Sequence, residues 1–247
     1  MAGMSARMLG LNSANKAIPD RERLIFALDV PTGQVARQWV EKLGDAVVFY
    51  KLGLQLFMAG GDWELTDWLA EKGKKVFVDL KFFDVPETVG AAVAQLRGRK
   101  AQFATVHGND EILRAAVKQK EDVKILAVTV LTSLDRHDLE DLGFSCDVER
   151  LVLSRARRAL DVGCDGVVCS GLEAAKLRQQ LGGGFLVVVP GIRPVENKPV
   201  DDQKRVVDVR QAMANGADYL VVGRPIRCAP DPRAKALEIQ AQIAGCL

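Results

Sequence analysis

The sequence predicts an α/β protein with the (β/α)8 or TIM-barrel architecture, in which eight parallel strands are ringed by helices. Three observations lead to this prediction. Eight short runs of β-branched and apolar residues recur along the 247 residues. Stretches with helical periodicity separate them, and the runs are almost continuously apolar, as in a parallel sheet covered on both faces. A doubly wound open sheet is the structural alternative, but it more often has six strands or fewer.

The predicted strands follow one another at fairly even spacing. In chain order they are LIFALD (24–29), VVFYKLG (47–53), KVFVDLK (75–81), FATVHG (103–108), ILAVTVLT (125–132), GVVCS (166–170), FLVVVPG (185–191) and YLVVGRP (219–225). Eight strand–helix units of this size suit a single barrel of about 250 residues.

Helices are predicted between the strands, where apolar residues recur with a period close to 3.6. Several of these stretches stop at a glycine, which favours a helix C-terminus. The clearest are VARQWVEKLG (35–44), WELTDWLAEKG (63–73), TVGAAVAQLRG (88–98), ILRAAVKQK (112–120) and VERLVLSRARRALDVG (148–163).

Two segments outside this alternation have a composition of their own. Residues 1–20 are polar and rich in Gly, Ser and Asn, so we expect a flexible N-terminal arm before a single barrel domain at 21–247. The stretch VENKPVDDQKR (195–205) is polar and follows the seventh strand. It predicts a long loop of the kind that often forms a functional lid.

Composition excludes several classes of partner. The formal net charge is +2, which gives no reason to expect nucleic acid or an anionic membrane. No apolar run approaches the ~20 residues of a membrane span, and the N-terminus lacks an apolar signal core. The five cysteines form no CxxC pair, so neither a disulfide framework nor a zinc site is expected. We therefore expect a cytoplasmic protein.

Polar residues follow the predicted strands at the end where barrel enzymes place their chemistry. In strand order they are Asp29, Lys51, Asp79 with Lys81, His107, Thr132 with Ser133, Ser170, Arg193 and Arg224.

The densest group lies in DLKFFDVPETV (79–89). Asp79 and Lys81 are two residues apart, so they share a face of their strand, and Lys51 and Asp29 reach the same mouth from neighbouring strands. Alternating charges keep each lysine protonated, which suits proton donation and not Schiff-base chemistry. A structural salt-bridge network at the rim is the alternative. For Thr88 the structural alternative is a cap on the next helix, with Pro86 just before the helix start.

The loops after strands seven and eight predict a phosphate site. They read PGIRP (190–194) and VGRP (222–225), and each offers glycine backbone N–H groups and an arginine. Gln203, in the long loop, could reach over the same ligand. Turn glycines with solvated arginines are the structural alternative.

From residue 24 to its end the chain resembles the orotidine 5′-phosphate decarboxylase family. The motifs that carry the resemblance are ALD in the first strand, DLKFFDVP, AVTVLTS (127–133), VCS (168–170), PGIRP with DDQKR, and DYLVVGRPI (218–226). It implies decarboxylation of orotidine 5′-phosphate to uridine 5′-phosphate and CO₂, the last step of de novo UMP synthesis, without metal or other cofactor.

The resemblance also implies roles for individual residues. Lys81 protonates the C6 carbanion, Asp79 lies beside the substrate carboxylate, and Lys51 holds the network. Asp84 and Thr88 reach into the site of a partner subunit, which implies a homodimer. The residues assigned to substrate binding are Asp29, Lys51, Thr88, Thr132, Ser133, Pro190, Arg193, Gln203, Gly223 and Arg224.

Some positions depart from the family pattern outside the charged core. They are Glu87, the HGND after strand four, Val189, and Asp208 with Val209, and they affect the expected substrate packing. Two other functions stay open. Sibling enzymes with the same DxKxxD motif bind a divalent metal and stabilise an enediolate, and a catalytically silent phosphoribosyl binder is a third class.

Overall fold

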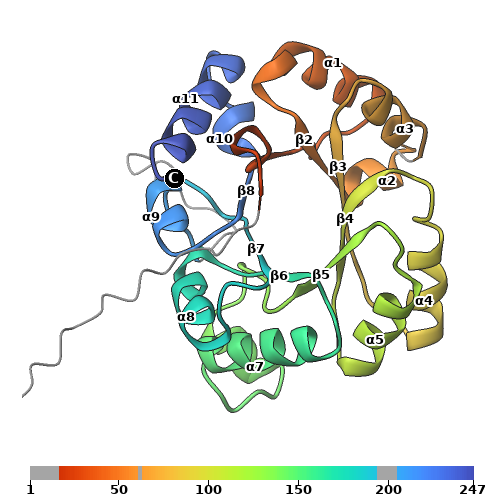
Figure 1. Ribbon diagram of the computed structural model, residues 1–247, viewed down its shortest axis with the longest axis vertical. Coiled ribbons are helices and arrows are strands. Elements are labelled where there is room, and N and C mark those ends of the chain that lie inside the picture. The colour runs from red at the N-terminus through yellow and green to blue at the C-terminus, as the bar shows by residue number, and fades with distance from the viewer. Residues whose placement is uncertain (1–16, 61–62, 194–204) are drawn as a thin grey trace, which may run out of the picture.

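The computed structural model describes residues 17–60, 63–193 and 205–247. Its strands form a closed barrel in the order β1 to β8, and helices surround the ring (Figure 1). Every neighbouring pair is parallel, including β8 with β1. The predicted fold class is therefore confirmed, and the open-sheet alternative is wrong because the first and last strands pair.

Each predicted apolar run overlaps one strand of the barrel. The strands are β1 (Leu24–Ala27), β2 (Phe49–Gly53), β3 (Lys75–Phe82), β4 (Ala101–Val106), β5 (Lys124–Val128), β6 (Gly166–Val168), β7 (Leu186–Val189) and β8 (Tyr219–Val222). Most end before the predicted run does.

The helices predicted from periodicity are all present. The described helices are α1 (Gly33–Leu43), α2 (Leu54–Met58), α3 (Trp63–Glu71), α4 (Pro86–Ala94), α5 (Asp110–Gln119), α6 (Arg136–Asp141), α7 (Val148–Asp161), α8 (Gly171–Leu181), α9 (Val209–Ala214), α10 (Arg224–Arg227) and α11 (Pro232–Ala244), with short 3₁₀ turns η1 (Asp20–Glu22) and η2 (Gly44–Ala46). None of those in the described residues is long and apolar enough to cross a membrane.

The start of α4 differs from the sequence interpretation. The helix begins at Pro86 itself, and its N-cap residue is Val85, without a side-chain cap. Proline suits this first position because the missing N–H would have no helical partner there. Thr88 lies inside the first turn, so its interpretation as a cap is wrong.

Two apolar layers position the site. One lies between the strands and the outer helices, and the other fills the barrel interior. The interior layer includes the aromatic rings of Phe49, Phe77, Phe103 and Tyr219. Tyr219 and Phe77 each meet Phe103 edge-on, with ring centroids 5.0 and 5.8 Å apart. These rings close the barrel below the carboxyl ends of the strands, so the cavity opens at one end.

The N-terminal part of the chain is described from Ala17 onward. Ile18 packs against the interior layer, and η1 follows at Asp20–Glu22. The rest of the predicted arm, 1–16, lies outside the described residues, as does most of the predicted loop at 195–205.

Candidate active site

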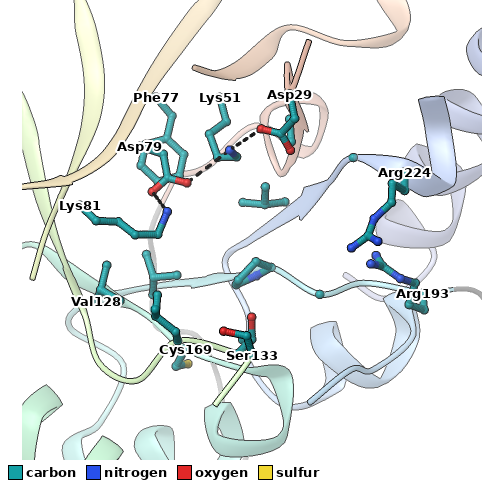
Figure 2. A pocket seen from close by; sticks show the side chains of 18 of the residues that line it. Asp29, Lys51, Phe77, Asp79, Lys81, Val128, Ser133, Cys169, Arg193 and Arg224 are labelled. Carbon is teal, nitrogen blue, oxygen red and sulfur yellow. Dashed lines mark hydrogen bonds and ion pairs between the residues drawn. The ribbon is translucent and has the colours of Figure 1, made fainter. Parts of the chain in front are cut away.

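A cavity of about 280 Å³ opens at the carboxyl ends of the strands. Its lining comes from β1, β2, β3, β5, β6 and β8 and from the segments after β1, β5, β6, β7 and β8. Figure 2 shows two groups on opposite sides: the acidic and lysine side chains around Asp79, and the guanidinium groups of Arg193 and Arg224. Charge is therefore distributed unevenly around the cavity: a network of both signs faces an end that carries only positive side chains.

The mixed network links four side chains in a row. Lys51 Nζ lies 3.1 Å from Asp29 Oδ1 and 3.3 Å from Asp79 Oδ2, while Lys81 Nζ lies 3.0 Å from Asp79 Oδ1. A Cβ atom on Gly53 would lie 3.1 Å from Lys51 Nζ and 3.3 Å from Asp29 Oδ1. Glycine at this position therefore leaves the space in which Lys51 meets Asp29.

Burial and neighbouring charge act against each other within this network. Burial raises the pKa of the Asp79 carboxyl group, but the ammonium groups of Lys51 and Lys81 outweigh it and leave that pKa below its ordinary value. Burial lowers the pKa of Lys51, but the carboxylates of Asp79 and Asp29 leave it above its ordinary value. At neutral pH, Asp79 is therefore an anion and Lys51 a cation, although each is only 9% exposed.

An irregularity in β3 brings Asp79 and Lys81 together. Val78 pairs with Ala104 and Phe82 pairs with Val106, so residues 79–81 span a stretch that Thr105 alone covers on β4. Lys81 takes up this extra length with a φ of +50°, in the left-handed region that favours glycine. A bulge of this kind re-aims a side chain beside a site.

Thr105 is a site residue that sequence reasoning missed. Its hydroxyl donates to Asp79 Oδ1 at 2.9 Å and accepts from the Lys81 backbone N–H at 2.9 Å. It is completely buried, and it follows the inward-facing Phe103 by two residues. That spacing was the available signal, because residues two apart on a strand share a face.

The wall between the two charged groups comes from β6 and from the loops after β5 and β7. It includes Thr132, Ser133, Cys169 and Pro190, of which Thr132 and Cys169 are buried. In Figure 2, Ser133 and Cys169 both lie across the cavity from Lys51. Cys169 was absent from the predicted site, although it lies in the quoted VCS segment.

The cationic end is built by the segments after β7 and β8. Arg193 follows β7, whereas Gly223 and Arg224 follow β8 directly, and all three line the cavity. Arg227 also lines it and donates a hydrogen bond to the backbone oxygen of Asp29. Arg227 was not predicted, although it lies one helical turn after Arg224.

Several predicted residues lie away from this cavity. Asp84 and Thr88 are exposed, and Asp84 Oδ1 accepts a hydrogen bond from the N–H of Val85. Gln203 lies outside the described residues.

His107 and Ser170, which were also named at the strand ends, do not line the cavity either. Burial and the nearby Arg155 lower the pKa of His107, whose Nδ1 lies 3.2 Å from the backbone oxygen of Val128. The Ser170 hydroxyl accepts a hydrogen bond from the N–H of Leu172 and caps α8. These hydrogen bonds are therefore with the backbone around the site.

No group of three His, Cys, Asp or Glu side chains that could hold a metal ion occurs within 17–60, 63–193 and 205–247. The charged network pairs its two aspartates with two lysines.

A closed (β/α)8 barrel with a lysine–aspartate network and a cationic end at its strand termini defines a class: barrel enzymes that act on phosphorylated substrates. Comparisons with known proteins narrow this class. The family described as "Orotidine 5'-phosphate decarboxylase / HUMPS family" matches residues 22–239. The chain belongs to this family.

Individual relatives carry the same name. The chain is 66% identical over 230 residues to orotidine 5'-phosphate decarboxylase of Methylococcus capsulatus, covering 93% of this chain and 95% of that protein. It is 48% identical over 240 residues to the enzyme of Stenotrophomonas maltophilia, covering 96% and 99%. The crystal structure of orotidine 5'-phosphate decarboxylase from Lactobacillus acidophilus superimposes with a TM-score of 0.79 at 33% identity, covering 90% and 99% of the two chains.

Proposed function

We propose that this protein decarboxylates orotidine 5′-phosphate to uridine 5′-phosphate and CO₂, the last step of de novo UMP synthesis. The observation that carries the proposal is the pairing of Lys81 with Asp79 on one side of a cavity whose other side holds Arg193 and Arg224. The names of the relatives support the same activity.

The substrate is oriented by its two unlike ends. Its phosphate dianion lies against Arg193, Arg224 and the backbone of Gly223, since arginine binds phosphate with two parallel hydrogen bonds. The ribose hydroxyl groups face Asp29 and Lys51, and the pyrimidine lies between Lys81 and the wall formed by Thr132, Ser133 and Pro190. Gln203 is assigned to the phosphate by the family resemblance alone.

Chemistry takes place at C6 of the pyrimidine. The bond from C6 to the carboxylate breaks, CO₂ leaves, and the electron pair stays on C6. The ammonium group of Lys81 stabilises this developing anion and then donates its proton to C6, and solvent returns a proton to the lysine. Asp79 lies where the substrate carboxylate enters, so repulsion between the two anions eases as CO₂ departs. We propose no metal ion or organic cofactor in these steps.

We also propose that the active form is a homodimer in which Asp84 and Thr88 of each chain complete the neighbouring site. Both residues are exposed, and neither lines the cavity of its own chain. Next to them, Phe83 and Val85 are 67% and 62% exposed, so the segment presents apolar surface together with a carboxylate.

The proposed function is tested by mixing purified protein with orotidine 5′-phosphate in EDTA and following the ultraviolet change that accompanies UMP formation. We expect turnover in EDTA by the wild type and its loss in Lys81→Ala. An inactive wild type that acts on a sugar phosphate once Mg²⁺ is added would refute the proposal and favour a metal-dependent sibling. Binding of UMP without any turnover would favour a silent phosphoribosyl binder.

A further inference from the structure

A pair of arginines outside the cavity holds the loop that carries Thr132 and Ser133. Arg155 of α7 donates from Nη1 to the backbone oxygen of Thr129 at 2.6 Å. Arg205 donates from Nη2 to the backbone oxygens of Val130 and Leu131, at 3.1 and 2.9 Å. Guanidinium groups therefore bind three successive carbonyl groups of this loop, immediately before Thr132 and Ser133.

The other arm of Arg205 is fixed by an acidic partner. Its Nη1 pairs with Glu173 Oε1, and both side chains are buried. Glu173 lies in the first turn of α8, where its Oε2 accepts a hydrogen bond from the Ser170 backbone N–H at 2.8 Å. Arg205 thus ties the loop to the start of a rigid helix, and the planar guanidinium sets the geometry of all three bonds at once.

The segment that carries Arg205 also contacts the cationic end of the cavity. Val207 bridges to Ile192, and the Arg193 backbone N–H donates to the Val207 oxygen at 2.9 Å. Gly171 leaves room for this segment, because a Cβ atom there would lie 2.3 Å from Val207 Cγ2. Residues 205–207 therefore contact both the loop that carries Thr132 and Ser133 and the segment that carries Arg193. These two walls face opposite ends of the proposed substrate.

We propose that Arg205 is a positioning residue that sets the loop carrying Thr132 and Ser133 against the pyrimidine. The proposal rests on the proposed function for the identity of the ligand. Arg205 acts through the carbonyls of Val130 and Leu131 and does not itself line the cavity. Its effect should therefore fall on recognition of the base and not on the phosphate contact.

The chain contains a matched arginine for comparison. Arg178 also binds one carboxylate and two carbonyl groups: it pairs with Asp218 at 2.7 Å and donates to the oxygens of Phe185 and Gly216, at 2.8 and 2.9 Å. It is buried to a similar degree. Its partners, however, precede β7 and β8, at the end of the barrel opposite the cavity.

The experiment compares Arg205→Lys with Arg178→Lys by calorimetric titration with UMP and with ribose 5-phosphate, which lacks the base. Lysine keeps the charge but cannot hold all three partners in the fork geometry. We expect Arg205→Lys to weaken UMP binding about tenfold, or about 1.4 kcal/mol, and to leave ribose 5-phosphate binding unchanged. Arg178→Lys should change neither affinity.

Equal weakening of both ligands by Arg205→Lys, or no weakening of either, would overturn the proposal. So would a wild type that binds ribose 5-phosphate as tightly as UMP, because the base would then contribute nothing. If Arg205→Lys fails to fold, the double variant Glu173→Gln/Arg205→Gln leaves no unpaired buried charge and should show the same base-selective loss. A wild type that binds UMP but leaves orotidine 5′-phosphate unconverted refutes the proposed function alone, since the two titrations still decide the role of Arg205.

Discussion

At the scale of single residues, the geometry of the site depends on the hydroxyl group of Thr105. Its single hydroxyl group satisfies the Asp79 carboxylate and the Lys81 backbone N–H simultaneously. We expect Thr105→Val to lower kcat at least tenfold, because the carboxylate loses a partner and the lysine backbone is no longer held. The unsatisfied buried groups should also lower the free energy of unfolding by about 1–3 kcal/mol.

The control for this change is Thr105→Ser, which keeps the hydroxyl group and removes only a methyl group. Steady-state kinetics of both variants provide the check. Equal kcat values for Thr105→Val and Thr105→Ser would show that the hydroxyl bonds do not position the catalytic pair.

The charge state of Lys51 makes a prediction about pH. Its folded-state pKa lies above its ordinary value, so the stabilisation from its ion pairs is fully present below the unfolded pKa and is lost as pH rises through the folded one. The difference in free energy of unfolding between wild type and Lys51→Met should therefore stay constant from about pH 6 to about pH 10 and decline only above that. Denaturant unfolding at a series of pH values measures it, and a slope between about pH 7 and about pH 9 would indicate a neutral lysine.

Strand alternation in the sequence was enough to predict the residues of the lysine–aspartate network. It was not enough to predict the residues that hold them in position. Asp79 and Lys81 could be placed on one face because they are two residues apart and follow an apolar run. Thr105 was passed over because it lies inside its predicted strand and not at the end of it, although its spacing from Phe103 places it on the inner face. Arg205 was passed over because its partners, the Glu173 carboxylate and two backbone oxygens, are far away in the sequence.

At the scale of elements, β3 contains a residue with a strained backbone, Lys81. Lys81 and Lys100 are the two residues other than glycine with positive φ in the described part of the chain, at +50° and +56°. Glycine relieves such strain, since a left-handed backbone costs an L-residue about 1–2 kcal/mol. We expect Lys81→Gly to be more stable than Lys81→Ala by roughly 1 kcal/mol, less any entropy cost of glycine in the unfolded chain, although both lack activity.

Lys100 supplies the control for this comparison, because it is exposed and far from the cavity. Lys100→Gly should exceed Lys100→Ala in stability by a similar margin, while both keep full activity. Thermal unfolding together with the ultraviolet assay gives both readouts. If alanine proved the more stable residue at position 81, the left-handed backbone there would not be a source of strain.

Helix ends were predicted with uneven success for a physical reason. A glycine that ends a helix does so through its backbone freedom alone. Gly44 and Gly163 therefore marked the ends of α1 and α7 correctly, and both have positive φ. The start of α4 depends on competition between Pro86 and Thr88 for a single position, and composition does not decide it. The irregularity in β3 depends on its pairing with β4, which no local pattern in β3 contains.

For the whole molecule, the proposed homodimer predicts complementation between inactive variants. Lys81→Ala lacks the proton donor, and Asp84→Ala lacks the carboxylate offered to the partner. In a mixed dimer, one site has the intact lysine of one chain and the intact Asp84 of the other. Since half of the dimers are mixed and half of their sites are intact, an equimolar mixture should regain about a quarter of wild-type activity.

The measurement is activity after denaturing and refolding the two variants together, with each variant refolded alone as the control. Activity no higher than that of the separate variants would refute shared sites. Sedimentation over a range of concentrations tests the dimer itself. The cytoplasmic location stays a prediction.

The closure of β8 against β1 has a consequence for protein synthesis. Asp29, Lys51, Asp79 and Lys81 belong to the first third of the chain, whereas Gly223 and Arg224 follow the final strand. A chain still emerging from the ribosome therefore contains the residues of the lysine–aspartate network before it contains Gly223 and Arg224. A phosphorylated ligand that requires both can stabilise only chains translated almost to the last helix. We therefore expect such a ligand to bind only after the last strand has been synthesised.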